Sequence, residues 1–158
     1  MAAGLERAGM ELLFHKVRIK PGKPILAGRA GGCWVFGLPG NPVSCMVNFL
    51  QFVRPWIRTA LGDPSPYLPV VDAVAGQSFK VKKTGRAKLQ RVRLQPGEQG
   101  WVAVSTGTQS SGALSSMAWA DGLLLISPDG NGPDEGDAVR VQLVNTGFLA
   151  ASGPNYPW

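Results

Sequence analysis

The stretch Val35–Ser44 reads V-F-G-L-P-G-N-P-V-S and predicts a sharp corner in the chain. The chain leaves an apolar strand through two glycines and two prolines. Asn41 is a good helix N-cap, and Pro42 suits the first helical position. Pro55 is expected to kink or restart the helix, and Gly62–Pro64 to end it. The helix itself is indicated by apolar residues at helical spacing, namely Val43, Met46, Val47, Leu50 and Val53.

Two interpretations of this corner fit its residues. It can be a purely structural turn between a strand and a helix. It can also hold an anion, because a helix N-terminus leaves N–H groups without partners and carries partial positive charge. Gly37 and Gly40 would let such a ligand approach the backbone. The residues of the corner alone do not choose between the two.

The segment before the corner predicts a helix end followed by short strands. Ala2–Leu13 indicates the last turns of a helix, and Phe14–Lys20 alternates like a strand. On such a strand Lys16 and Lys20 would face the same side, where both could meet an anion. Ile25–Gly28 is expected to be extended, and Cys33–Leu38 is an apolar run typical of a strand buried on both faces.

After residue 69 the pattern changes to short strands separated by Gly and Pro turns, which is typical of a small antiparallel sheet or barrel. The fold class is therefore α/β plus all-β. We expect a partial α/β domain over residues 1–62, a linker over 63–69, a β-barrel-like domain over 70–145 and a tail over 146–158. The expected strands are Val70–Ala75, Ser78–Val81, Ala87–Leu94, Trp101–Thr106, Leu123–Ser127 and Ala138–Val144, with a helical turn at Ser115–Ala120.

Charge is unevenly distributed along the 158 residues, whose formal net charge is +6. No Asp or Glu occurs between Leu12 and Gly62, and a second basic block runs from Lys80 to Arg93. Such asymmetry favours an anionic ligand. The second block also allows nucleic-acid binding by the β domain, although Phe79, directly before the block, is the sole aromatic residue of this stretch and stacking surfaces are sparse.

Other function classes find little support. No apolar run reaches the ~20 residues of a membrane span, and Met1–Lys20 lacks a signal-peptide pattern, so a cytoplasmic location is expected. Cys33 and Cys45 lack metal-ligand spacing, and no metal-ligating residues are predicted. His15 is the single histidine, and no Ser/Cys–His–carboxylate set can be assembled around it.

Two motifs in order carry a family resemblance. F-H-K-V-R-I-K-P-G-K-P at Phe14–Pro24, followed by the corner at Val35–Ser44, resembles the molybdopterin molybdenumtransferase family, which includes the E domain of gephyrin. The runs Gly107–Ile126 and Glu135–Val141 resemble the C-terminal domain of that family and its closing strand. The resemblance extends from about Gly4 to Val144 and implies the C-terminal half of a molybdopterin-binding α/β domain followed by a small β-barrel-like domain.

The resemblance implies an enzyme of molybdenum cofactor biosynthesis. The family inserts molybdate into adenylylated molybdopterin with Mg²⁺-dependent release of AMP, as a cytoplasmic homodimer. A molybdopterin adenylyltransferase is a possible partner. Lys16 and Lys20 match the lysines of the family's active site, and Ser111 matches a serine that faces it. The substrate-binding loop of the family corresponds to Pro39, Gly40, Asn41 and Pro42.

The chain also departs from the family pattern. The family carries further N-terminal domains and a G-G-x-S-x-G-D-Y-D segment, which supply acidic residues, and these are not in this sequence. Mg²⁺ prefers carboxylate oxygens together with substrate phosphates. We therefore expect a C-terminal fragment that is inactive alone. The alternatives are a basic β module that binds nucleic acid and a non-catalytic scaffold.

Overall fold

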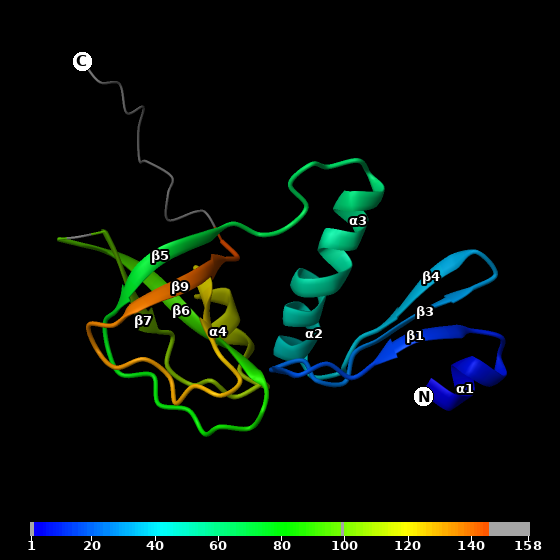
Figure 1. Cartoon of the computed structure of the whole chain (residues 1–158), viewed down its shortest axis with the longest axis horizontal. Helices are drawn as coiled ribbons and strands as arrows, with labels where there is room; N and C mark the ends of the chain where they lie inside the picture. Colours follow the sequence, from blue (N-terminus) through cyan, green and yellow to red (C-terminus); the bar gives the residue numbers. More distant parts are fainter. Residues whose placement is uncertain (1, 99, 146–158) are drawn as a thin grey trace, which may run out of the picture.

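A computed structural model describes residues 2–98 and 100–145 of the chain. Figure 1 shows three parts: a small sheet near the N-terminus, a helix running through α2 and α3, and a β-barrel. The helix lies between the sheet and the barrel. Mixed α/β structure followed by a small β-barrel is the predicted fold class, and it is confirmed.

The first sheet is antiparallel, with strand order β1–β3–β4. Its strands are β1 (Glu11–His15), β3 (Leu26–Ala30) and β4 (Cys33–Gly37), preceded by α1 (Ala2–Arg7). The extended segment predicted at Ile25–Gly28 is confirmed within β3. The helix predicted over Ala2–Leu13 is wrong beyond Arg7, because Gly9 turns with φ of 88° and Glu11 then pairs with Arg29 of β3.

Strand β4 occurs where the apolar run predicted it, but its predicted burial on both faces is wrong. Cys33 and Trp34 are exposed, and the rest of β4 is half-buried. Within the described residues β4 pairs with β3 alone, and one edge and much of one face therefore meet solvent. The Trp34 ring packs against Phe36 and against Trp56 of the helix, at centroid distances of 6.4 and 5.4 Å.

The single strand predicted over Phe14–Lys20 is also wrong. Strand β1 ends at His15, and Lys16 turns into the left-handed region with φ of 69°. The chain then forms β2 (Ile19–Lys20), which pairs in parallel with β6 of the barrel and places Lys20 opposite Lys88. Lys16 consequently lies in the connection between the two sheets, whereas Lys20 ends β2 of the second sheet, and the two lysines do not share a strand face.

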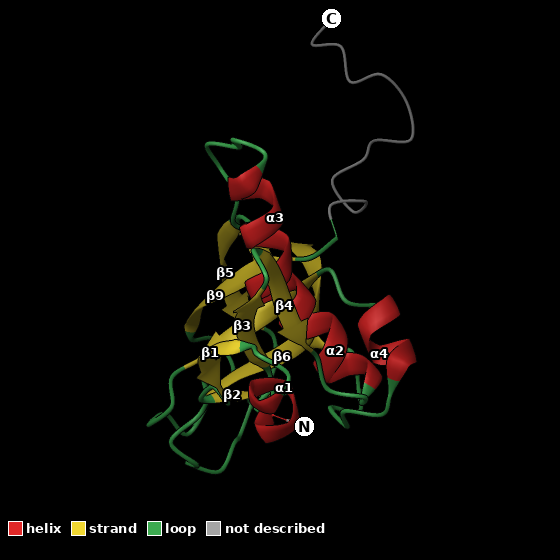
Figure 2. Ribbon diagram, turned by 90° about the vertical axis from the view of Figure 1, so that its right-hand side faces the viewer, coloured by secondary structure: helices red, strands yellow, loops and turns green. Residues whose placement is uncertain are grey.

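The helix after the corner is interrupted where proline predicts it. It consists of α2 (Pro42–Asn48), a π-helical turn η1 (Phe49–Val53) and α3 (Arg54–Ala60). Pro55 has no N–H for the usual i→i−4 bond, and the π turn lies directly before it. Gly62, with φ of 78°, follows the helix end as expected. Figure 2 shows α2 and α3 following one another as a single interrupted helix, with α4 beside α2.

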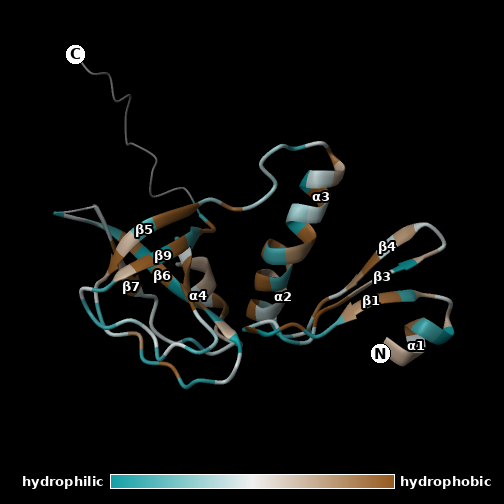
Figure 3. Ribbon diagram, in the orientation of Figure 1, coloured by the Kyte–Doolittle hydropathy of each residue, from teal (hydrophilic) through white to brown (hydrophobic). Residues whose placement is uncertain are grey.

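The second sheet closes into a barrel of five strands, to which β2 is added. The strand order is β2–β6–β7–β5–β9–β8, and β6 also pairs with β8. The core is formed by inward-facing residues such as Val92, Ala103 and Val141, and Figure 3 shows the hydrophobic residues along β5 and β9. The barrel strands are β5 (Val70–Ala75), β6 (Ala87–Gly97), β7 (Gly100–Ser105), β8 (Gly122–Ile126) and β9 (Ala138–Leu143).

The strands predicted after residue 69 are confirmed, except for the one predicted at Ser78–Val81. Ser78–Val81 is irregular, although its N–H groups at Phe79 and Val81 donate to the carbonyls of Pro133 and Asn131 at 2.8 Å. The predicted helical turn is present as α4 (Leu114–Ala118). The boundaries proposed at residues 62 and 69 stay a prediction, and the predicted tail at 146–158 lies outside the described residues.

The helix and the barrel are held together by an apolar contact that we call the α2–barrel cluster. Its buried members are Val43, Val47, Leu89, Met117 and Leu123. Helix α2 therefore packs on the outer face of β6 and β8, and this packing brings the turn after β2 next to the barrel. No helix in the described part of the chain has the length and apolarity of a membrane span.

Candidate functional site

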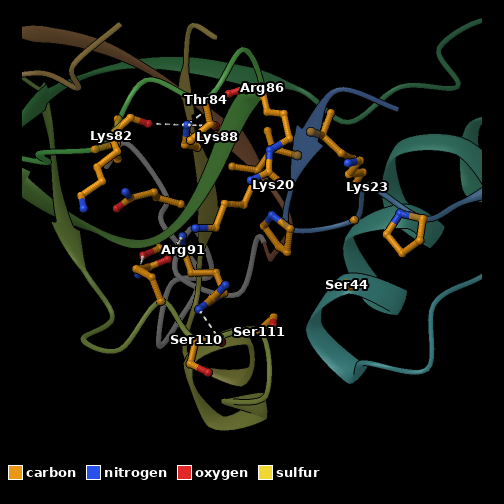
Figure 4. A pocket seen from close by; sticks show the side chains of 18 of the residues that line it. Lys20, Lys23, Ser44, Lys82, Thr84, Arg86, Lys88, Arg91, Ser110 and Ser111 are labelled. Atoms are coloured by element: carbon orange, nitrogen blue, oxygen red, sulfur yellow. Dashed lines mark hydrogen bonds between the residues drawn. The ribbon is translucent and has the colours of Figure 1, made fainter. Parts of the chain in front are cut away.

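A cleft of about 710 Å³ lies between the turn after β2, the start of α2 and the barrel. Figure 4 shows Lys20 and Lys23 from the turn on one side and Lys88 and Arg91 from β6 on the other. The remaining lining residues are Ile19, Pro21, Gly22, Pro24, Ser44, Lys80, Val81, Lys82, Thr84, Arg86, Leu89, Gln90, Gln109, Ser110 and Ser111.

The lining of the cleft is strongly cationic. It contains seven Lys and Arg residues and no Asp or Glu. Ion pairs in residues 2–98 and 100–145 are Arg58–Asp63 and Lys80–Asp134, and therefore Lys80 alone among these seven cations has a carboxylate partner there. Like charges gathered without counter-charge repel one another, and an anion entering the cleft would relieve that repulsion.

Arg91 forms the floor of one end of the cleft and is fully buried, at 0% exposure. Its Nε donates to the Ser116 hydroxyl at 2.8 Å, and Nη2 donates to the carbonyls of Thr108 and Ser110 at 3.1 and 3.0 Å. All three acceptors are neutral. Burial lowers the pKa of Arg91 from its ordinary value, but a guanidinium keeps its proton in proteins. A fixed positive charge is thus held out of water without a carboxylate beside it.

Lys88 occupies the other end of the cleft and is only 5% exposed. Its ammonium group donates to the Lys82 carbonyl at 2.9 Å and to the Thr84 hydroxyl at 2.8 Å, with a longer contact of 3.4 Å to the Arg86 carbonyl. Burial lowers the pKa of Lys88, and the charges of Lys20 and Arg86 lower it further. Its environment is therefore both desolvated and electropositive.

The corner loop meets the cleft through Ser111. The Asn41 amide donates to the Ser111 hydroxyl at 3.0 Å, and the Val43 N–H points to the Ser111 carbonyl at 3.4 Å. Asn41 has the position and extended backbone of an N-cap, but its side chain makes no cap hydrogen bond. The start of α2 is therefore partly used by the barrel's own loop.

Comparisons with known proteins match both parts of the chain. Residues 1–59 match the family described as "Probable molybdopterin binding domain", and residues 73–144 match the "MoeA C-terminal region (domain IV)". The chain belongs to the molybdopterin molybdenumtransferase family. Sequence and structure comparisons agree with these matches.

Relatives in the molybdopterin molybdenumtransferase family are moderately similar to this chain. The Haemophilus influenzae enzyme is 34% identical over 90% of the chain. A Mycobacterium tuberculosis molybdopterin molybdenumtransferase 2 is 40% identical over 73% of the chain. The molybdopterin biosynthesis MoeA protein from Pyrococcus horikosii superposes with a TM-score of 0.70, at 34% identity over 89% of the chain. The chain spans 35%, 28% and 34% of these proteins, about a third of their length.

The residues that match the molybdopterin molybdenumtransferase motifs are only partly brought together. Lys20 and Ser111 line the cleft. Asn41 touches Ser111, whereas Pro39, Gly40 and Pro42 are outside the lining. Lys16 is exposed and also outside the lining. The sequence predicts that both lysines and the start of the helix line one cavity. Of the two lysines, Lys20 alone lines the cleft.

Sequence reasoning did not single out Arg91, Lys88, Lys23 or Ser110 as site residues of a family member. Arg91 and Lys88 belong to the basic block at Lys80–Arg93, for which the sequence also allows nucleic-acid binding. One feature of the sequence does indicate that Arg91 is special: it lies between the apolar residues Leu89 and Val92, on a predicted strand whose neighbouring side chains are expected to be buried. An arginine at such a place requires partners.

The described residues do not fit a resident Mg²⁺ site. The cleft lining has no carboxylate, and no group of three His, Cys, Asp or Glu residues capable of holding a metal occurs within 2–98 and 100–145. Magnesium is bound by one or two carboxylates plus substrate phosphates and water. We therefore assign no step of the chemistry to a metal held by these residues.

Proposed function

We propose that the chain acts in molybdenum cofactor biosynthesis by binding molybdate in the cationic cleft, for insertion into the dithiolene of adenylylated molybdopterin with release of AMP. The names of its relatives support this reaction class. Since the chain spans about a third of those relatives, the whole reaction and its substrates belong to the proposal.

The observation that carries the proposal is the buried guanidinium of Arg91. Its charge is desolvated and has no carboxylate beside it, and its surroundings include the hydroxyl-bearing loop of Ser110 and Ser111. Nε and Nη2 of Arg91 donate to the protein, which leaves the Nη1 donors for an oxyanion, and a dry setting strengthens each charge-assisted bond. Molybdate is a tetrahedral dianion, and it would supply the negative charge and the acceptor oxygens that this end of the cleft lacks.

Lys20 supports the same assignment from the opposite wall. It is the last residue of β2, directly before the Pro21–Pro24 turn, and it lines the cleft. We propose that Lys20 and Lys16 act on the anionic substrate, Lys16 from outside the described lining. Ser111 is proposed to bind substrate directly. Pro39, Gly40, Asn41 and Pro42 are proposed to shape the loop that holds Ser111.

The finer features implied by family resemblance are proposals as well. They are Mg²⁺ dependence of AMP release, a homodimeric assembly, a cytoplasmic location and passage of substrate from a molybdopterin adenylyltransferase. Exposed apolar side chains on β4 and the helix, including Trp34 and Ile57, support the covering of that face by another protein surface. The lining of the cleft gives no support to magnesium held by this chain's described residues.

The nucleic-acid alternative is less well supported by the cleft. Proteins that bind single strands stack bases on aromatic rings. None of the residues lining the cleft is aromatic. The lining does supply polar donors and a fixed arginine, which suit a compact anion better than a chain of bases.

The test is titration of the 158-residue chain with molybdate at constant ionic strength, followed by calorimetry. We expect saturable binding that Arg91→Met weakens at least tenfold and that Arg91→Lys restores only in part, because lysine keeps the charge but lacks the several nitrogens that let arginine bond the protein and an anion together. Arg93→Met is the matched control, since Arg93 is exposed on the same strand and lies outside the lining. Unchanged affinity in a folded Arg91→Met variant would overturn the proposal.

A further inference from the structure

The cleft has two cationic ends that are fixed separately. Lys88 and Arg91 are three residues apart in β6, and their pairing with β8 runs without a break from Lys88–Ile126 to Val92–Gly122. On a regular strand three residues span about 10 Å and an odd separation places side chains on opposite faces. Loops then hold the two charges: Lys82, Thr84 and Arg86 hold Lys88, whereas Ser116, Thr108 and Ser110 hold Arg91.

Figure 4 shows the same separation. Lys88 lies with Thr84 and Arg86 at one end, Arg91 lies with Ser110 and Ser111 at the other, and Lys20 lies between them. Because the hydrogen bonds of each charge are made to a different loop, the two groups cannot close on one small tetrahedral ion without giving up those bonds. A ligand that satisfies both ends has two anionic groups, or two anions bind at once.

We propose that Lys88, Lys20 and Arg86 form a second anion subsite, built for a phosphate group, distinct from the oxyanion subsite at Arg91. The proposal rests on the proposed function, in that it assigns the phosphate of the substrate to one end of the cleft and molybdate to the other.

The charge balance at Lys88 is the first argument for this subsite. Its ammonium group is buried, its three acceptors are neutral, and its register partner across the β2–β6 pairing is another lysine, Lys20. Bringing Lys20 and Arg86 near a desolvated cation is unfavourable, as the lowered pKa of Lys88 indicates. A phosphate dianion placed among the three cations would convert this repulsion into attraction.

Hydrogen-bonding chemistry is the second argument. The Thr84 hydroxyl accepts from Lys88 and so keeps its own proton to donate. A phosphate group presents three acceptor oxygens and about −1.5 to −2 charge near neutral pH. Lys20, Arg86 and the Thr84 hydroxyl supply donors, and Lys88 supplies charge and can exchange its long 3.4 Å contact with the Arg86 carbonyl for a phosphate oxygen. The absence of carboxylates from the lining leaves nothing to repel the ligand.

The experiment titrates the chain with inorganic phosphate, with molybdate, and with each in the presence of saturating amounts of the other, at constant ionic strength. We expect phosphate and molybdate to bind together. Lys88→Met should weaken phosphate binding at least tenfold and leave molybdate affinity within twofold, whereas Arg91→Met should do the reverse. Lys83→Met is the control, because Lys83 is exposed in the same loop and outside the lining.

The outcomes separate this inference from the proposed function. Strict competition between the two anions, or phosphate affinity that ignores Lys88→Met, overturns the second subsite while leaving molybdate binding intact. Phosphate binding that depends on Lys88 without any molybdate binding supports the subsite and overturns the proposed function. Binding of neither anion overturns both. If Lys88→Met unfolds in a thermal melt, Lys88→Arg, which keeps the cation, must retain phosphate binding.

Discussion

Lys16 carries an unusual backbone for its residue type, and this has a measurable consequence. Within the described residues it is the non-glycine residue with positive φ, at 69°. An L-residue in that region pays about 1–2 kcal/mol, whereas glycine adopts it readily at an entropic cost of about 0.5–1 kcal/mol. We predict that Lys16→Gly raises the free energy of unfolding by up to about 1 kcal/mol in urea denaturation. Lys83→Gly, at an exposed loop position without positive φ, should lower it, and a loss of stability in both variants would contradict the prediction.

Individual site residues were predictable where a motif fixed them and not where packing did. Lys20 and Ser111 were found from family motifs, and both line the cleft. Arg91 was one of several cations in a basic block, and its special character comes from burial by Thr108, Ser110 and Ser116, which follow it by 17 to 25 residues. Contacts over such separations leave no local pattern in the sequence.

A buried side chain of α2 holds the turn that follows Lys20 and carries Lys23. Asn48 is fully buried, its amide donates to the Gly22 carbonyl at 2.9 Å, and its Oδ1 has no hydrogen-bond partner among the described residues. A Cβ on Gly22 would lie 2.4 Å from that Oδ1, which shows how closely the turn sits on the helix. Asn48 lies outside the cleft lining and therefore positions the turn from behind.

We predict that Asn48→Leu changes global stability little, because the penalty of about 1–3 kcal/mol for leaving the buried Gly22 carbonyl without its donor is offset by removal of the unsatisfied Oδ1 acceptor, whose cost is of similar size. The turn itself should loosen. Amide exchange at Val17, whose N–H donates to the Lys23 carbonyl at 3.0 Å, should speed up. Gly22→Ala should give the same result through its clash, whereas Gly40→Ala, with open space around it, should not. Unaltered exchange at Val17 in both turn variants would refute the positioning role.

At the level of elements, the sequence was informative where local chemistry acts alone. Pro55 and Gly62 predicted the break and the end of the helix, and the alternating segments after residue 69 predicted most barrel strands. Predictions failed where a distant partner decides the conformation. Glu11–Leu13 became a strand because β3 pairs with it, and the segment after Lys16 left its sheet because β6 pairs with Ile19 and Lys20.

The cleft is a property of the whole molecule, because its walls come from both parts of the chain. The turn after β2 and Ser44 contribute one wall, and β6 with its loops contributes the other. The charge asymmetry predicted an anionic ligand for each basic block separately. That the two blocks face one another depends on the β2–β6 pairing, which places Lys20 opposite Lys88, and on the α2–barrel cluster, whose members are spread from Val43 to Leu123. Only the packed structure shows that one cavity uses both blocks.

This dependence predicts a difference between two valines that are alike in type and burial. Val47 lies in the α2–barrel cluster and Val141 in the barrel core, and both are 0% exposed. Val47→Ala and Val141→Ala should each cost about 1–3 kcal/mol in denaturant unfolding, since each removes two buried carbons and leaves a cavity. Only Val47→Ala should also weaken molybdate binding, by threefold or more, because loosening α2 moves Ser44 and the turn that carries Lys23 relative to Arg91. Equal loss of affinity in both variants would contradict this prediction, because molybdate affinity would then depend on overall stability rather than on how α2 packs against the barrel.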